Sequence, residues 1–375
     1  MAGKHGRLFH PMGEGESEGI SMKKTRLGVI FGSRSGEYEI SLMSGAAVIA
    51  AAEETGNFEV VPIGITRRGE WKRVHGSLST IPEDRWEEQA TDLNPGSLKE
   101  WVDFVFPVLH GPFGEDGTIQ GMLEMMDIPY AGCGVLASSL AMDKGVAKEI
   151  FRVQGLPQTE YRLVTEESFQ LHKDDILKEI GSQLVLPYFV KPANMGSSVG
   201  ISKVKGFDKL EEALLEAFRF DRRVLVEEGV NCREVEISVM GASPEELLLS
   251  SIGEILPAEE FYDYRAKYQA EGASKLVIPA DLTSNQVKEI EEIARKAFNA
   301  IDGSGFARID FFIQREMGNI YINEINTIPG FTKYSMMPLL WGDKGVTFPE
   351  LIQRIVGYGY ERYYAKNRRQ TNLCR

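Results

Sequence analysis

The chain reads Gly305-Phe-Ala-Arg-Ile-Asp-Phe-Phe-Ile313 and, a few residues later, Asn319-Ile-Tyr-Ile-Asn-Glu-Ile-Asn-Thr327. Both runs are continuously apolar or alternate between apolar and polar residues, over lengths that suit β-strands. The residues Arg315-Glu-Met-Gly-Asn319 between them are typical of a turn. The pattern therefore predicts a β-hairpin.

This predicted hairpin carries charged side chains on one face. Side chains two positions apart on a strand point the same way, so Arg308 accompanies Asp310, and Glu324 accompanies Asn326. Oxygen ligands of this kind suit a hard cation such as Mg²⁺, and a neighbouring guanidinium can stabilise a phosphoryl group in transfer. The alternative is a solvated surface with cross-strand ion pairs.

Composition narrows the class of protein. The 375 residues contain 43% hydrophobic residues, enough for two or three domains, and the net charge of −13 argues against binding to nucleic acid or to anionic membranes. Cys133, Cys232 and Cys374 are isolated and lack metal-type spacing, which favours reduced thiols and a cytoplasmic protein. Residues 1–22 are polar and unpatterned, so we expect a disordered extension, and no later run is long enough to span a bilayer.

Residues 23–132 are expected to form an N-terminal α/β domain. A strand at 27–31, a glycine turn and a helix at about 37–54 are followed by strands at 58–66 and 104–109. Glu37 begins the helix, where an acidic residue favourably opposes the helix dipole even without a function. His110 ends a strand before a glycine loop, where open α/β sheets bind ligands, although a structural hydrogen bond is the alternative.

Residues 133–231 are expected to form a central lobe. A helix at about 138–155 carries Lys144, and strands and helices then alternate around the glycine- and serine-rich loop 196–200, which we call the flap. Such a loop can cover phosphates with its N–H and hydroxyl groups, unless it is an ordinary hairpin turn. Lys191 at the end of an apolar strand favours phosphate binding. Lys144, Glu227 and Glu228 would by default be solvated charges.

Residues 232–375 are expected to form a C-terminal lobe. Strands at 234–240 and 247–255 precede the aromatic stretch 259–273, which lacks clean periodicity, and a helix at 283–300 leads into the hairpin. A long aperiodic loop inside a compact domain is usually functional, so we expect 259–273 to form a lid. A last helix is expected from about 348 through 364.

Several motifs follow one another along the chain. They are Glu37 with Ser41, His110-Gly with Gly114-Glu-Asp-Gly117, Lys191-Pro with Gly196-Ser-Ser-Val-Gly200, Phe261-Tyr-Asp-Tyr-x-Ala-Lys-Tyr268, Arg308-x-Asp310, and Glu324-x-Asn326-Thr-x-Pro-Gly330. Taken in order, these motifs resemble the D-alanine–D-alanine ligase family. The resemblance spans roughly residues 25 to 360. It implies an ATP-grasp fold, with a Rossmann-like N-terminal α/β domain and ATP bound between a central and a C-terminal α+β lobe.

The resemblance also implies roles for individual residues. Those expected at ATP are Lys144, Lys191, Ser198, Glu227, Glu228, Val230, Glu234, Phe261, Lys267 and Phe312, and those expected at two Mg²⁺ ions are Asp310, Glu324 and Asn326. Mn²⁺ can replace Mg²⁺ in this expectation, and a monovalent cation such as K⁺ can be required. The catalytic set is Glu37, Ser197, Tyr268, Arg308 and Gly330, and the substrate pockets add His110, Ser335 and Met336.

The activity that the resemblance implies is ATP-dependent ligation of two D-alanine molecules through an acyl phosphate, for peptidoglycan precursors. Tyr268 favours this dipeptide over the depsipeptide product of a D-alanine–D-lactate ligase. Met336 stands where leucine is more usual, which bears on the second substrate pocket. The alternatives are a D-lactate or D-serine ligase of the same fold, and a nucleotide sensor without catalysis. The expected partners are D-alanine, ATP and a second copy of the chain.

Overall fold

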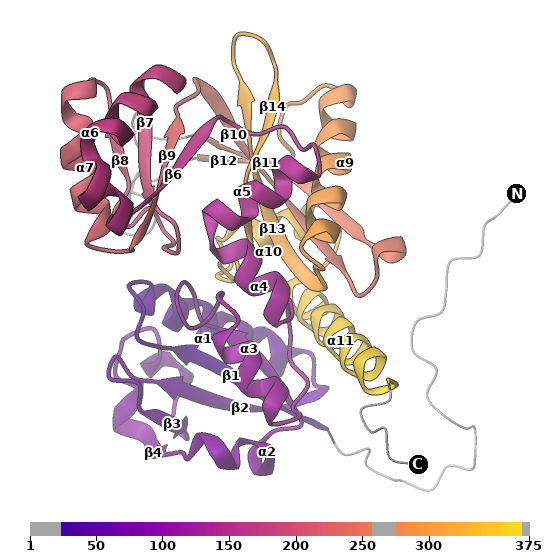
Figure 1. Cartoon of the computed structure of the whole chain (residues 1–375). Coiled ribbons are helices and arrows are strands. Elements are labelled where there is room, and N and C mark those ends of the chain that lie inside the picture. The colour runs from indigo at the N-terminus through magenta and orange to yellow at the C-terminus, as the bar shows by residue number, and fades with distance from the viewer. Residues whose placement is uncertain (1–23, 257–274, 370–375) are drawn as a thin grey trace, which may run out of the picture.

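The structure is a computed structural model that describes residues 24–256 and 275–369. The predicted extension 1–22, the predicted lid 259–273 with Phe261, Lys267 and Tyr268, and Cys374 lie outside the described residues. Within them the chain forms three β-sheets with helices packed against them (Figure 1).

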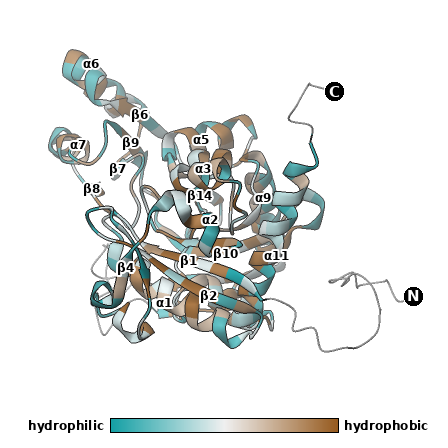
Figure 2. Cartoon of the chain, turned by 90° about the horizontal axis from the view of Figure 1, so that it is seen from below, coloured by the Kyte–Doolittle hydropathy of each residue, from teal (hydrophilic) through white to brown (hydrophobic). Residues whose placement is uncertain are grey.

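The N-terminal sheet has the strand order β4-β3-β2-β1-β5. Its strands are β1 (Thr25–Gly32), β2 (Phe58–Ile65), β3 (Trp71–Val74), β4 (Ala90–Asp92) and β5 (Phe104–Val108), and its helices are α1 (Tyr38–Glu54), α2 (Leu98–Trp101) and α3 (Thr118–Met125). The central strand β1 runs parallel to both β2 and β5. Parallel strands bury both faces. Accordingly Val29 and Phe31 lie in one core and Ile30 in another. Figure 2 shows brown, hydrophobic stretches along β1 and β2.

The predicted helix at 138–155 is two helices, α4 (Val135–Met142) and α5 (Lys144–Val153). The break falls at Asp143, whose backbone is extended and whose carboxylate accepts a hydrogen bond of 2.9 Å from the Val146 N–H. Such an N-cap satisfies a donor that the helix itself leaves unpaired. Lys144 therefore occupies the first turn of a new helix, not the middle of a long one.

The second sheet is antiparallel, with the order β6-β9-β7-β8. Its elements follow the predicted sequence of strand and helix: β6 (Tyr161–Thr165), α6 (Glu166–Gln183), β7 (Tyr188–Pro192), the flap, β8 (Ser202–Val204), α7 (Leu210–Phe218) and β9 (Arg223–Glu228). Apolar side chains of α6 and α7, among them Phe169 and Leu214, cover one face of the sheet.

The third sheet has the order β12-β11-β10-β13-β14. Its strands are β10 (Cys232–Gly241), β11 (Leu248–Leu256), β12 (Lys275–Val277), β13 (Gly305–Gln314) and β14 (Ile320–Asn326), and the accompanying helices are α9 (Ser284–Ala300), α10 (Met336–Asp343) and α11 (Phe348–Asn367). Strands β13 and β14 pair antiparallel, which confirms the predicted hairpin. The core on one side alternates along β13 through Ala307, Ile309 and Phe311, so the charged residues between them face the other way.

Two pairs of helices contact more than one sheet. Residues of α4 and α5, including Ala141 and Phe151, share a core with β10, β13 and α9 of the third sheet. Residues of α10 and α11, including Trp341 and Ile355, share a core with β1 and α1 of the first sheet. The physical reason is amphipathicity, because each helix buries its apolar stripe on whichever sheet face is open.

Two glycines of α11 provide a test of this packing. A Cβ atom added at Gly359 would lie 2.5 Å from the Phe104 ring and 2.6 Å from the Tyr130 carbonyl oxygen, whereas one added at Gly357 meets nothing within 4 Å. We expect Gly359→Ala to lower the free energy of unfolding by about 1–3 kcal/mol through overpacking. Gly357→Ala should raise it by up to about 1 kcal/mol, because alanine favours helix. Urea unfolding of both variants measures the difference, and equal effects would contradict the close packing of α11.

Candidate active site

A cavity of about 540 Å³ lies between the three sheets. Residues from separate parts of the chain line it, which places loops after β1 and β5 opposite the strands of the other two sheets. The predicted residues among its lining are Glu37, His110, Lys144, Lys191, Ser197, Ser198, Glu227, Glu228, Val230, Glu234, Arg308, Phe312, Glu324, Asn326 and Gly330. The fold thus gathers in one place most of the site residues predicted from sequence.

The hairpin brings the predicted metal ligands together. Arg308 is paired with Asn326, and Asp310 with Glu324, across β13 and β14. The Asn326 amide donates to the Asp310 carboxylate at 3.0 Å, and Arg308 binds the same carboxylate at 2.7 and 2.8 Å. Lys144 Nζ lies 3.4 Å from Glu324 Oε2. The strand register alone therefore collects two carboxylates and an amide oxygen on one face.

This donor set fits a magnesium ion. Within residues 24–256 and 275–369 no group of three or more His, Cys, Asp and Glu side chains is arranged so that it could hold a metal ion by itself. Magnesium ordinarily takes one or two carboxylates and completes its shell with water and phosphate oxygens. Cationic side chains already lie against both carboxylates, which shows that this face of the hairpin attracts positive charge.

Glu37 reaches across the cavity to the flap. It directly precedes α1, but its side chain makes no capping hydrogen bond to that helix. Instead the Ser197 hydroxyl donates to the Glu37 carboxylate, a contact between residues 160 apart in the sequence. A Cβ added at Gly111 or Gly196 would lie 2.4 Å from Glu37 Oε2, so both loops need glycine to admit the carboxylate. The helix-dipole explanation is therefore insufficient for this residue.

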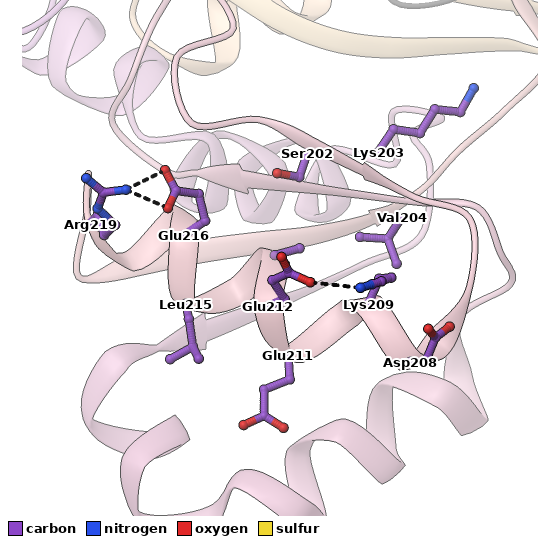
Figure 3. Close-up of a pocket in the computed structure, with 11 residues that line it drawn as sticks. Ser202, Lys203, Val204, Asp208, Lys209, Glu211, Glu212, Leu215, Glu216 and Arg219 are labelled. Carbon is purple, nitrogen blue, oxygen red and sulfur yellow. Dashed lines mark hydrogen bonds and ion pairs between the residues drawn. The ribbon is translucent and has the colours of Figure 1, made fainter.

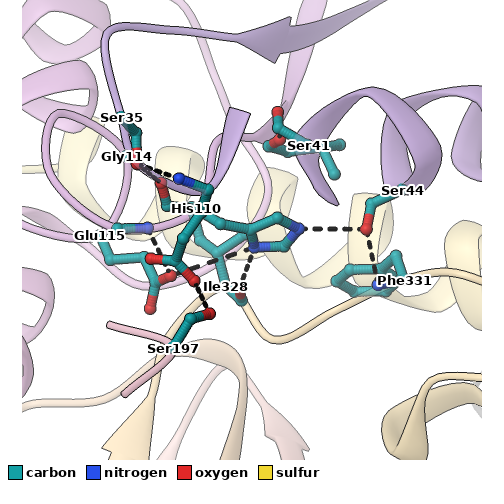
Figure 4. A network of polar contacts seen from close by, with 12 residues as sticks. Ser35, Ser41, Ser44, His110, Gly114, Glu115, Ser197, Ile328 and Phe331 are labelled. Carbon is teal, nitrogen blue, oxygen red and sulfur yellow. Dashed lines mark hydrogen bonds and ion pairs between the residues drawn. The ribbon is translucent and has the colours of Figure 1, made fainter. Parts of the chain in front are cut away.

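His110 has both ring nitrogens occupied by protein groups (Figure 4). Nδ1 lies 2.8 Å from the Ile328 carbonyl oxygen and Nε2 lies 3.0 Å from the Ser44 hydroxyl, which also accepts a bond from the Phe331 N–H. Burial lowers the pKa of His110 to about 4, so the ring is neutral at pH 7. A neutral ring must then donate from Nδ1 to the carbonyl and accept at Nε2. The histidine ties β5 to the loop that carries Gly330.

Glu115 is a site residue that the sequence reasoning did not single out. It lines the cavity, accepts a hydrogen bond of 3.0 Å from the Gly111 N–H, and lies 4.0 Å from His110 Nδ1. Burial, reinforced by the negative charge of Glu37, raises its pKa to about 8. The available signal was its position in Gly114-Glu-Asp-Gly117, directly after the histidine loop.

Glu227 was expected to be a linker acid, exposed by default, but only 1% of it is exposed. Its carboxylate lies 2.5 Å from Lys191 Nζ and 2.6 Å from Nζ of Lys148, a residue absent from the predicted set. Glu228 has a different partner from Glu227: its carboxylate accepts a hydrogen bond of 2.7 Å from the Val185 N–H. On the other side of the cavity, Lys144 donates to the Met195 carbonyl oxygen at 2.8 Å, next to the flap.

Two predicted substrate residues do not line the cavity. Ser335 accepts a hydrogen bond of 3.0 Å from the Thr332 N–H, and its hydroxyl lies 2.8 Å from where a Cβ of Gly330 would stand. Met336 is 5% exposed, and its sulfur lies 2.6 Å from where a Cβ of Gly253 would stand. Ser335 thus borders the Gly330 turn, whereas Met336 belongs to the packing of α10 on β11.

A second hollow, of about 830 Å³, lies on the outer surface over α7 and β8 (Figure 3). Its charged side chains include the ion pairs Lys209–Glu212 at 3.1 Å and Arg219–Glu216 at 2.8 Å, each between residues three positions apart at one end of α7. These are exposed pairs of neighbouring residues, which need no ligand. The candidate active site is therefore the cavity of about 540 Å³ and not this surface hollow.

Comparison with known proteins points to one family. The model described as D-ala D-ala ligase N-terminus matches residues 26–133, and that described as D-ala D-ala ligase C-terminus matches residues 150–357. The protein named D-alanine--D-alanine ligase of Geobacillus kaustophilus is 45% identical over 359 residues, covering 92% of this chain and 96% of its own. That of Acetivibrio thermocellus is 44% identical over 368 residues, covering 91% and 97%.

Solved structures agree with this similarity. The VanG D-Ala:D-Ser ligase of Enterococcus faecalis superposes with a TM-score of 0.80 at 36% identity, covering 90% of this chain and 100% of its own. The D-alanine-D-alanine ligase of Coxiella burnetii gives a TM-score of 0.80 at 29% identity, covering 92% and 96%. The expected ATP-grasp fold is thereby confirmed.

The titration of Glu115 gives a prediction for stability against pH. The folded chain keeps a proton on Glu115 up to about pH 8, whereas the ordinary pKa is 4.5. Between these values the folded state binds more protons than the unfolded state, so this residue makes stability fall as pH rises. Glu115→Gln cannot ionise, and its Tm should therefore fall less than that of the unaltered protein between pH 5 and 8. The exposed control Glu100→Gln should keep the original slope, and an unchanged slope in Glu115→Gln would contradict the assignment.

Proposed function

The chain belongs to the D-alanine–D-alanine ligase family, and we propose how its own residues bind the substrates and promote the reaction. It is an ATP-dependent enzyme that joins two D-alanine molecules to D-alanyl-D-alanine for cell-wall precursors. The observation that supports the assignment of residues is the single cavity, where carboxylates, lysines, an arginine and a glycine-rich flap converge from three sheets.

We propose that the nucleotide lies between the second and third sheets. Lys144 and Lys191 would bind its phosphates, and the flap residues Ser197 and Ser198 would cover them with hydroxyl and N–H groups. The remaining proposed nucleotide contacts are Glu227, Glu228 and Val230 at the adenine, Glu234 at the ribose, and Phe312 packed against the base.

Asp310, Glu324 and Asn326 would hold the divalent metal that the family uses, which we propose to be two Mg²⁺ ions, with Mn²⁺ as a substitute and K⁺ as a further cation. When bound, such ions neutralise phosphate charge and align the γ-phosphate for transfer. Arg308 and the Gly330 N–H would stabilise charge on the oxygens of the reacting carboxyl group. The pairing of β13 with β14 supports this proposal, because it brings Arg308, Asp310, Glu324 and Asn326 together.

Glu37 would bind the ammonium group of the first D-alanine, because its buried carboxylate points into the cavity from the N-terminal domain. The carboxylate of that D-alanine attacks the γ-phosphate and forms an acyl phosphate, with ADP as the leaving group. The amine of the second D-alanine then attacks the acyl carbon, and inorganic phosphate leaves as the amide bond forms. We place Ser335 beside the second substrate, with Met336 behind it in the wall of α10.

The acyl phosphate must be kept from water, which would hydrolyse it. We propose that the flap closes one side of the cavity. The hydrogen bond from Ser197 to Glu37 supports this, as does the one from Lys144 to Met195 next to the flap. We further propose that the enzyme is a homodimer, as the family resemblance implies. We also propose that it is located in the cytoplasm, in line with its isolated cysteines. No helix of the described residues is both long and apolar enough to cross a membrane.

A phosphate-release assay tests the function directly. In the presence of ATP and Mg²⁺, phosphate should be released when D-alanine is the only amino acid added. When D-lactate or D-serine is offered as the second substrate, little of the mixed product should form. Glu324→Gln should reduce turnover by on the order of 100-fold or more, because it removes charge stabilisation in the transition state. Glu316→Gln, an exposed acid in the turn of the same hairpin, is the matched control and should retain activity. Phosphate release independent of D-alanine would contradict the ligase function.

The role of Glu37 has a separate test. Glu37→Gln removes the negative charge but keeps the size, so the KM for D-alanine should rise on the order of tenfold or more while the KM for ATP stays within about twofold. Glu39→Gln alters an exposed acid that pairs with Arg67 and should leave both constants unchanged. If neither constant moves in Glu37→Gln, the residue does not bind the ammonium group.

A further inference from the structure

Lys148 is a buried cation next to the cavity, and it is not among the residues proposed above to bind substrate or metal. It lies on α5, one turn after Lys144, and only 2% of it is exposed. Its Nζ lies 2.6 Å from Glu227 Oε1 and 3.3 Å from the Thr159 hydroxyl, which itself donates to the same carboxylate oxygen. It does not line the cavity, so its effect must pass through Glu227.

Glu227 is shared by two lysines. Lys191 on β7 binds Oε2 at 2.5 Å, while Lys148 binds Oε1 from the opposite side. Burial opposes the ionisation of Glu227, but Lys148 and Lys191 outweigh this effect and lower its pKa. Burial also lowers the pKa of Lys148, which the negative charge of Glu227 counteracts. The three side chains form one cluster with a single surplus positive charge.

The two lysines differ in what else they can reach. Lys191 lines the cavity with 12% of its side chain exposed, and the charges of Glu324 and Glu234 also act on it. Among the described residues, the Lys148 ammonium contacts Glu227 and Thr159 and lies 5.2 Å from the Tyr161 ring, and the more distant charges of Lys191 and Glu160 act on it. Lys191 can therefore turn towards a ligand, whereas Lys148 stays with the carboxylate.

We propose that Lys148 is a positioning residue that acts as the permanent counter-ion of Glu227 and so leaves the charge of Lys191 available to the nucleotide phosphates. A buried carboxylate with one cationic partner holds that partner tightly, because separating them leaves an unpaired buried charge. With Lys148 in place, Lys191 can move to an anion while Glu227 remains paired. The inference rests on the proposed function of Lys191 in phosphate binding.

Kinetic and binding measurements on the whole enzyme test this inference. Lys148→Met should raise the KM for ATP about tenfold or more and weaken ADP binding in calorimetry to a similar extent, with the KM for D-alanine within about twofold. Lys148→Arg should restore most of the ATP affinity, since it restores the charge. Lys209→Met removes an exposed lysine of the outer surface and should change nothing.

A double variant separates charge pairing from simple packing. If Lys148 acts by neutralising Glu227, then Lys148→Met combined with Glu227→Gln should bind inorganic triphosphate more tightly than Lys148→Met alone. This ligand lacks the adenine that Glu227 is proposed to contact. No improvement in the double variant, or an equal rise in both KM values for Lys148→Met, would overturn the inference. If Lys148→Met does not fold, as judged by circular dichroism, the comparison of Lys148→Arg with the double variant decides. Unchanged ATP affinity in Lys191→Met would instead contradict the proposed function of Lys191.

Discussion

The position of β13 between β10 and β14 is the constraint on which the rest of the site depends. Its register places Glu236, Asp310 and Glu324 side by side across three strands, with Arg308 next to them and 2.9 Å from Glu236. A shift of β13 by one residue would turn Arg308 and Asp310 into the apolar core and bring Ile309 and Phe311 to the cavity. Packing of the apolar side chains on one face of the sheet therefore determines which side chains lie on the opposite face, at the cavity.

The charged side chains at the cavity are arranged in pairs of opposite sign. Lys144 lies near Glu324, Lys148 and Lys191 share Glu227, and Arg308 lies between two carboxylates. Each of these buried charges has an opposite partner, as a low-dielectric environment requires. Binding of a polyphosphate with its metal ions would therefore exchange partners within the site instead of neutralising isolated charges, and substrate binding would need only small movements of long side chains.

The sequence predicted part of this arrangement and missed another part, for physical reasons. The hairpin was predictable because strand periodicity is local, and so was the order of elements around the flap. The burial of Glu227 and its pairing with Lys148 were not, because α5 and β9 meet only in three dimensions. The break at Asp143 was not predicted, because the cap depends on the conformation of one side chain. The packing of α11 on the first sheet was not predicted either, because an amphipathic pattern does not show which sheet a helix packs against. The roles at the cavity came from family resemblance, and the contacts around these residues give each role a physical basis.

The packing of α11 has a consequence for the way the protein is made. Leu351, Ile352 and Ile355 complete the core formed by β1 and α1, and Gly359 lies against Phe104. Synthesis on the ribosome delivers the first sheet more than two hundred residues before the helix that covers it. Until then one apolar face of that sheet lacks its native partner and is exposed to other chains or to chaperones. The core of the first sheet is therefore completed only by residues that are synthesised more than two hundred positions later.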